Sequence, residues 1–208
     1  MLEDLTELNA YLGQVQRQRD EYVRCELALS LSARMSDAEL VQALTVALPM
    51  IQGIAPRIVR SRGRGVVLTA KLRYRAGVRM LSSAVLTQEE AAALDTARCV
   101  MADFLPLDEE ERFRRVYEWV CQHVRYIHTA PGQKGYERLV SASGALLDGQ
   151  ANCQGFADAL YLLCGLCGIE CEYRCGLGER RLHVWNAVRI NGEWRDADAS
   201  KGARGIAD

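Results

Sequence analysis

The sequence predicts a fold of mixed helices and strands, in which helices pack on small antiparallel sheets. Three observations predict it. Apolar and polar residues alternate from Tyr22 to Leu31, as they do in a half-buried strand. Helix-capping sequences begin at Ser36 and at Thr87. An Asn191-Gly192 pair separates two strand-like runs near the C-terminus, and this pair is a strong signal for a two-residue hairpin turn.

The first part of the chain is expected to form a small helix-on-sheet unit. The strand over 22–31 places Val23, Cys25, Leu27, Leu29 and Leu31 on one side. A helix follows the capping box Ser36-x-x-Glu39, and two further strands are expected over 57–60 and 65–75, joined around Gly63 and Gly65. We therefore predict two domains, over residues 1–85 and 86–208, whose boundary is a change of composition and not a flexible linker.

The charge and hydropathy of the sequence indicate a nearly neutral chain without a membrane-spanning segment. The 208 residues carry a formal net charge of -1, and no run of apolar residues is long enough to cross a membrane. The acidic N-terminus lacks the basic and apolar regions of a signal peptide, which favours a cytoplasmic location. An exported chain whose leader has been removed would look the same. The sequence leaves the oligomeric state open.

A basic stripe lies between Arg57 and Arg79, where the chain has eight Lys or Arg and no acidic residue. It could contact nucleic acid or another anionic polymer. The alternative is a solvated hairpin face whose charges protect an edge strand. Because Tyr74 is the only aromatic residue in the stripe, we expect nucleic acid not to be a partner.

From Thr87 onward the chain becomes predominantly helical. The capping box Thr87-x-x-Glu90 begins one helix, which runs toward Pro106. Asp108, followed by three glutamates, begins the next helix with acidic residues at its positive end.

Cys153 differs from the other seven cysteines, which lie mostly among apolar residues and are expected to be reduced. It follows the polar run Gly149-Gln150-Ala151-Asn152, and an apolar helical pattern begins immediately after it. Cys153 is therefore expected at the N-terminus of a buried helix. There the helix dipole and the unpaired N–H groups favour a thiolate and can hold an oxyanion. The alternative is that Cys153 only caps or packs.

Four later cysteines suggest a zinc site, but their spacing favours a place in the core. Cys164 and Cys167 lie on the apolar face of the predicted helix, and Cys171 and Cys175 alternate along the next strand. Structural zinc sites usually have two Cys-x-x-Cys pairs, and this chain has one. We expect no bound metal and no cofactor.

The hairpin places a histidine beside an aspartate. The strand over 182–190 returns over 193–199, and a two-residue turn requires paired positions to sum to 383. His183 and Asp198 then share a face as diagonal neighbours, within reach of a hydrogen bond, whereas Asp196 lies farther along the hairpin. A carboxylate in this position orients the imidazole, which can then keep a nearby Cys as thiolate and donate a proton to a leaving amine. His123 and His128 have no comparable partner.

The order of these residues resembles the transglutaminase-like superfamily. The matching stretches are 145–157 around Cys153, 168–171, 183–186 with His183, and 194–199 with Asp198. The resemblance covers residues 110–200. It implies an α+β, papain-like core in which the nucleophile helix packs on an antiparallel sheet. It also implies that Cys153 is the nucleophile, His183 the general acid and base, and Asp198 the residue that orients the histidine.

The resemblance implies a thiol-dependent hydrolase that cleaves amide bonds of a protein or peptide through an acyl-enzyme. Two alternatives are open: transfer of a glutamine acyl group to an amine, and a binding or scaffold module without activity. The sequence departs from the family after the aspartate, where Ser200-Lys201 replaces the usual Thr-Trp. It also continues only as a Gly-rich, unpatterned segment, so we expect a truncated domain with less support for the hairpin.

Overall fold

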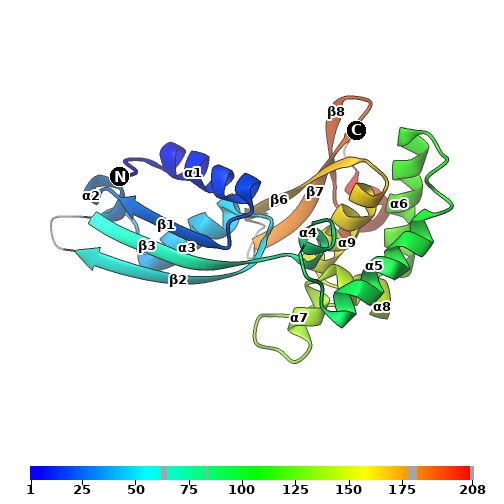
Figure 1. The fold of residues 1–208 in the computed structure, drawn as a ribbon, viewed down its shortest axis with the longest axis horizontal. Helices are drawn as coiled ribbons and strands as arrows, with labels where there is room; N and C mark the ends of the chain where they lie inside the picture. The colour runs from blue at the N-terminus through cyan, green and yellow to red at the C-terminus, as the bar shows by residue number, and fades with distance from the viewer. Residues whose placement is uncertain (62–64, 83, 178–181, 207–208) are drawn as a thin grey trace. The chain divides into compact units, whose positions relative to one another are not determined.

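The computed structural model describes residues 1–61, 65–82, 84–177 and 182–206 of the chain. The chain divides into two compact units, residues Met1–Tyr74 and Arg75–Asp208. Figure 1 shows the elements of both units. Unit 1 consists of α1 (Leu5–Gln18), β1 (Tyr22–Leu27), α2 (Leu29–Ser32), α3 (Asp37–Ala47), β2 (Ile51–Ser61) and β3 (Gly65–Tyr74).

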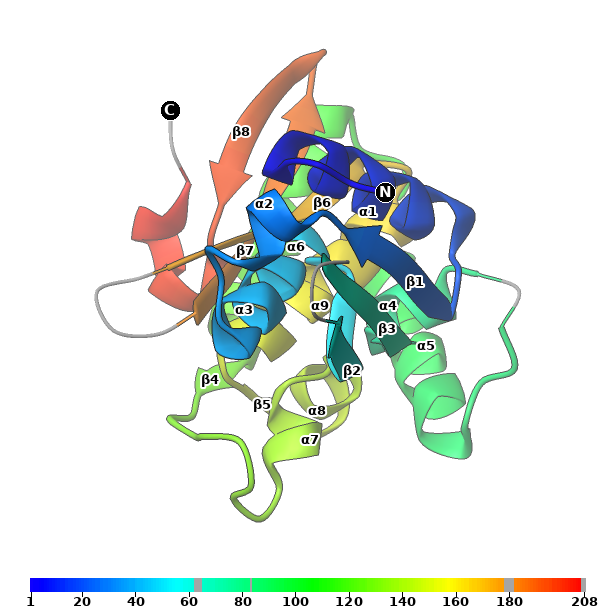
Figure 2. The same ribbon diagram turned by 90° about the vertical axis from the view of Figure 1, so that its left-hand side faces the viewer.

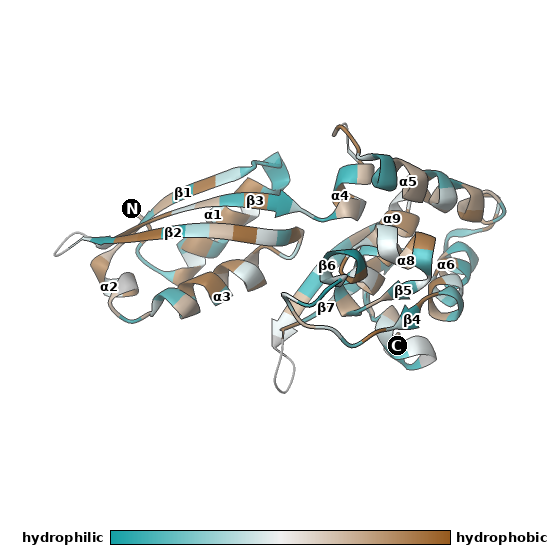
Figure 3. Ribbon diagram, turned by 90° about the horizontal axis from the view of Figure 1, so that it is seen from below, coloured by the Kyte–Doolittle hydropathy of each residue, from teal (hydrophilic) through white to brown (hydrophobic). Residues whose placement is uncertain are grey.

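Unit 1 is a three-stranded antiparallel sheet, in the order β1-β3-β2, with helices on its apolar side. Leu8 and Leu12 of α1 and Leu40 and Leu44 of α3 are buried, as are the inward-facing residues of the central strand β3. In Figure 3 the apolar colouring lies along α3 and the strands beside it. The predicted helix-on-sheet arrangement is therefore present, and the Ser36 capping box is formed as expected.

Three elements of unit 1 differ from the prediction. Helix α1 was not predicted, although Asp4 caps it by accepting a hydrogen bond from the N–H of Glu7. Strand β1 ends at Leu27 and not at Leu31, because the chain enters the short helix α2 at Leu29. Strand β2 is longer than the predicted 57–60, since pairing with β3 continues back to Ile51. The expected connection around Gly63 lies outside the described residues.

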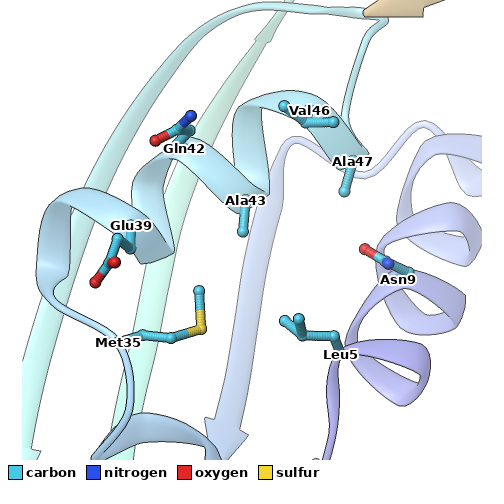
Figure 4. A pocket seen from close by; sticks show the side chains of 8 residues that line it. All are labelled: Leu5, Asn9, Met35, Glu39, Gln42, Ala43, Val46 and Ala47. Carbon is cyan, nitrogen blue, oxygen red and sulfur yellow. The ribbon is translucent and has the colours of Figure 1, made fainter. Parts of the chain in front are cut away.

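A groove opens between α1 and α3 (Figure 4) and has a volume of about 620 Å³. Leu5, Met35 and Val46 form part of its apolar lining, and Glu39 and Gln42 lie among them. All of its lining residues belong to unit 1, so none of the three residues predicted to be catalytic contributes to it.

The basic stripe is not one continuous set of free charges. Arg60 forms an ion pair with Asp37 in unit 1. Arg79 forms one with Glu90 in unit 2, where Arg75 is buried. Arg62 and Arg64 lie outside the described residues.

Unit 2 combines helices with a second three-stranded sheet, in the order β6-β7-β8. Its first elements are α4 (Ala76–Met80), α5 (Gln88–Met101), α6 (Glu109–His123), β4 (Arg125–Tyr126), α7 (Tyr136–Leu139), α8 (Ala142–Asp148) and β5 (Gln150–Ala151). The others are α9 (Cys153–Leu166), β6 (Glu170–Leu177), β7 (Leu182–Ile190), β8 (Glu193–Ala197) and the 3₁₀ helix η1 (Ala199–Gly205). The predicted mixture of helices and strands is confirmed.

Helix α9 is the central element of unit 2. Phe156, Leu160, Leu163 and Cys164 are buried within one apolar cluster that also contains residues of α5, α6, α8 and β7. The predicted caps at Thr87 and Asp108 are formed, and they fix where α5 and α6 begin. Among the described residues no helix is long and apolar enough to cross a membrane.

Asp158 of α9 is a fully buried carboxylate that ties four elements together. It accepts hydrogen bonds from the N–H of Gly77 in α4 (3.0 Å), from the N–H of Ala142 at the start of α8 (2.7 Å) and from the hydroxyl of Tyr173 in β6 (2.6 Å). Burial raises the pKa of this carboxyl, and the nearby Arg75 opposes that rise. A buried carboxylate is tolerated only when such partners compensate it.

We predict that Asp158→Ala destabilises unit 2 by about 3–5 kcal/mol, because it leaves buried donors and the Arg75 charge without their partner. Urea unfolding of the full chain, followed by tryptophan fluorescence, measures this change. Asp95→Ala is the matched control, since the Asp95 side chain is 76% exposed and should matter little. A loss of stability no larger than that of the control would contradict the prediction.

Candidate active site

The thiol of Cys153 lies at the first residue of α9, as the sequence predicts. Asn152 caps the helix, and its side-chain oxygen accepts hydrogen bonds from the N–H groups of Gln154 and Gly155. The Cys153 residue is buried. The start of the helix is therefore fixed by a polar cap directly beside the sulfur.

Cys153 is in a setting that favours its thiolate. Burial raises the pKa of the thiol, but several hydrogen bonds outweigh this effect and leave the pKa below its usual value. They come from the His183 side chain and from the N–H groups of Val184 and Gln154, and the charge of His183 adds to them. By contrast, burial raises the pKa of Cys25 and Cys167 to about 11. Cys153 thus differs chemically from the cysteines of the core.

His183 and Asp198 are brought together by the hairpin. The register follows the predicted pairing from Ile190 opposite Glu193 to Asn186 opposite Ala197, but β8 ends at Ala197 and not at Ala199, because Asp198 caps η1. The Nε2 atom of His183 lies 2.7 Å from Oδ2 of Asp198. This hydrogen bond is the main cause that raises the pKa of His183 to about 9, and the contact with Cys153 adds to it.

The Asp198 carboxylate has more partners than the sequence indicated. Its Oδ1 accepts hydrogen bonds from the backbone N–H and the hydroxyl of Ser200, the latter at 2.6 Å. Lys201 Nζ lies 3.2 Å from Oδ2. Burial opposes ionisation, but these contacts and His183 lower the pKa of Asp198 to about 2. The Ser200-Lys201 departure therefore supplies two side chains that hold the carboxylate.

The segment after Asp198 is folded and not a loose tail. It forms η1, red in Figure 2, and then turns back so that Ile206 pairs with Ala197. The Tyr117 hydroxyl of α6 lies 3.1 Å from the Asp198 carbonyl and 2.8 Å from that of Gly202. A side chain at Gly205 would collide with the Asp198 carbonyl oxygen. We expected weak support for the hairpin, but the backbone of Gly205 lies in close contact with the backbone of Asp198.

Tyr126 of β4 is a site residue that the sequence did not indicate. The backbone N–H of Cys153 donates a hydrogen bond to its hydroxyl, which is also hydrogen-bonded to the thiol. Burial, followed by the Cys153 charge, raises the pKa of Tyr126. Strand β4 has two residues and pairs with the equally short β5, so no periodicity could have identified it.

The other chemistry-bearing residues that the sequence singled out are spread over several elements. His123 ends α6 and stacks on Trp119, and His128 contacts the Tyr126 ring edge-on. Cys164 is buried on α9, and Cys171 and Cys175 follow on β6. Among the described residues no group of three or more His, Cys, Asp or Glu is arranged to hold a metal ion.

Comparison with known proteins agrees with this geometry. Residues 101–199 match the family model described as the transglutaminase-like superfamily. The chain therefore contains a transglutaminase-like domain, and Cys153, His183 and Asp198 all lie within it.

Similarity to individual proteins is partial. The kyphoscoliosis peptidases of Homo sapiens and Mus musculus are 29% and 28% identical over 110 residues, which cover 47% of this chain and 16% of each peptidase. The chain thus spans about a sixth of the length of these relatives. A solved structure described as a TGase is 15% identical, with a TM-score of 0.49, over 90% of this chain and 53% of that one.

We predict that Asp198→Asn lowers the pKa of His183 from about 9 toward the ordinary value of 6.5, because the hydrogen bond with the largest upward effect is weakened. NMR titration of the imidazole C–H signals measures the change, and His183→Gln assigns the signal. Since the folded-state pKa of His183 is raised, its contribution to stability is complete below pH 6.5 and is lost as the pH rises through about 9. An unchanged His183 titration in Asp198→Asn would contradict this role of Asp198.

Proposed function

We propose that the chain is a thiol-dependent hydrolase that cleaves an amide bond in a protein or peptide. The observation that supports this most directly is the hydrogen-bonded series Asp198–His183–Cys153 at the N-terminus of α9. The lowered pKa of Cys153 and the raised pKa of His183 both favour a thiolate–imidazolium pair over a thiol and a neutral imidazole. A thiolate next to a charged imidazole is both a nucleophile and a proton donor.

The proposed reaction has two steps. The Cys153 thiolate attacks the amide carbonyl carbon, and the resulting oxyanion is held by the Cys153 N–H. The His183 imidazolium gives its proton to the leaving amine, so that a thioester forms and the C–N bond breaks. His183 then takes a proton from water, which attacks the thioester; the C–S bond breaks, the acid is released, and the Cys153 thiolate and the His183 imidazolium are restored. Asp198 keeps the imidazole oriented throughout.

Hydrolysis is proposed over transfer to an amine because the site is open to water. The His183 side chain is 29% exposed. A water molecule can therefore reach the imidazole that activates it, whereas transfer to an amine requires water to be kept out.

Tyr126 is proposed as a second donor to the oxyanion. Its hydroxyl interacts with the Cys153 N–H, which is the group proposed to hold the oxyanion. When the substrate displaces it from that N–H, the hydroxyl remains close enough to donate its own hydrogen bond to the oxyanion.

We predict that Cys153→Ala and His183→Ala each lower amide hydrolysis by at least about a thousandfold, since each removes one part of the nucleophile pair. Release of new amino termini from a denatured-protein or peptide-library substrate measures the activity. In parallel, iodoacetamide should label Cys153 faster than the exposed Cys99 at pH 7 in the unaltered chain. Cys99→Ser is the matched control and should keep full activity. Equal labelling of Cys153 and Cys99 would favour the binding-module alternative.

We predict that Tyr126→Phe lowers kcat by about ten- to a hundredfold with little change in KM, because an oxyanion donor acts mainly in the transition state. Steady-state kinetics with a peptide substrate measures both constants. A variant that is faster than the unaltered chain would instead mean that the hydroxyl blocks the site.

A further inference from the structure

Arg75 is the first residue of unit 2 and lies outside the stretch that matches the family model. It is only 3% exposed, although arginine is rarely so deeply buried. Its guanidinium lies over the ring of Tyr173, 5.3 Å from the ring centre. It also interacts electrostatically with the buried Asp158, where it opposes the rise of the carboxyl pKa. These two contacts compensate for the burial of the charge.

A third contact leads from Arg75 to the nucleophile. Its Nη1 atom donates a hydrogen bond to Oε1 of Gln154, at 3.2 Å. Gln154 immediately follows Cys153 in α9, and its Nε2 atom donates to the Tyr136 hydroxyl of α7, at 3.1 Å. The Gln154 side chain is therefore held at both ends of its amide. Charge compensation for Asp158 alone does not explain this third contact.

The backbone of Gln154 acts directly on the site. Its N–H group donates to the Asn152 cap, at 2.9 Å, and is one of the hydrogen bonds that lower the pKa of Cys153. A side chain fixed at both ends restricts the backbone to which it belongs. The side-chain contacts of Gln154 and the hydrogen bond from its N–H to Asn152 therefore act on the same first turn of α9.

We propose that Arg75 is a positioning residue of the active site, which holds Gln154 and with it the first turn of α9 against the Cys153 sulfur. The proposal rests on the proposed function, because it assigns a role in preparing the nucleophile. According to this proposal, Arg75, which precedes the residues that match the family model, contributes to the geometry of the thiol site.

The test measures the thiolate of Cys153 and needs no substrate. The full-length chain is alkylated with iodoacetamide across the pH range, and the rate at Cys153 is followed by peptide mass spectrometry with Cys99 as the internal reference. The titratable groups around Cys153 are His183 of β7, Tyr126 of β4 and Cys175 of β6, with Asp198 behind His183. All four are left unchanged in the variants. The acid limb is the part of the pH–rate profile in which alkylation of Cys153 rises as the thiol loses its proton, and a shift of this limb reports the effect of Arg75 and Gln154.

Arg75→Met and Gln154→Met should each move the acid limb to higher pH. If the pKa of the thiol rises by about one unit, alkylation below both pKa values slows by about tenfold. Arg75→Lys keeps the positive charge but loses the planar guanidinium with its fixed donors, and should shift the acid limb by an intermediate amount. In the double variant Arg75→Lys/Gln154→Met the shift should equal that of Gln154→Met alone, because Arg75 acts through Gln154.

Arg79→Met is the matched control. It removes another arginine of the same segment, together with its ion pair to Glu90, and should lower the melting temperature without moving the acid limb. The proposal is overturned if Arg75→Met lowers the melting temperature but leaves the acid limb in place. If Arg75→Met does not fold, an unmoved acid limb in Gln154→Met overturns it equally. Failure of the proposed function is seen separately, as Cys153 labelling no faster than Cys99 in the unaltered chain.

Discussion

The buried carboxylate of Asp158 is the interaction on which the architecture of unit 2 depends. It lies in the middle of α9 and is bonded to α4, to the start of α8 and to β6. Because a buried carboxylate without partners is costly, these elements can pack only where their donors meet it. The sheet that carries His183 and the helix that carries Cys153 are consequently held in one arrangement. The geometry of the candidate site therefore depends on a residue that lies outside it.

The site itself joins a helix terminus to a strand hairpin. The helix contributes its first N–H groups and a thiol, and the segment of β7, β8 and η1 contributes the imidazole and the carboxylate. Neither element alone favours the thiolate, because burial raises the pKa of Cys153 until the donors from both elements oppose it. The same burial leaves Cys25 and Cys167 as ordinary, inert thiols. The contrast between Cys153 and these two cysteines therefore comes from hydrogen-bond donors, since all three are buried.

The sequence predicted those parts of the site that local rules determine. The two-residue turn at Asn191-Gly192 fixes the hairpin register, and the register alone is enough to distinguish Asp198 from Asp196. The position of Cys153 followed from the polar run that precedes an apolar helical pattern. The domain boundary proposed near residue 85 rested on composition, whereas the compact units divide after Tyr74. The contacts of α4 with α9 that assign this segment to unit 2 leave no trace in composition.

Other parts depend on contacts between residues far apart in the chain, which local patterns do not encode. Tyr117 reaches Asp198 across 81 positions, and Arg75 reaches Gln154 across 79. Arg75 was grouped with a basic stripe because its neighbours in sequence are basic, yet it is buried beside an acid of α9. Strand β1 was extended too far because the alternation of leucines continues through Leu29 and Leu31, which lie in helix α2.

Gly77 and Gly205 show how backbone contacts limit the sequence around this site. A Cβ atom at Gly77 would lie 2.8 Å from the carbonyl oxygen of Asp158, and one at Gly205 would collide with that of Asp198. At each position the glycine backbone lies in close contact with the backbone of a residue that fixes the site, Asp158 in the first case and Asp198 in the second. A residue larger than glycine at either position would force the neighbouring backbone to shift. The absence of a side chain at these two positions is therefore as necessary to the geometry of the site as the thiol is to its proposed chemistry.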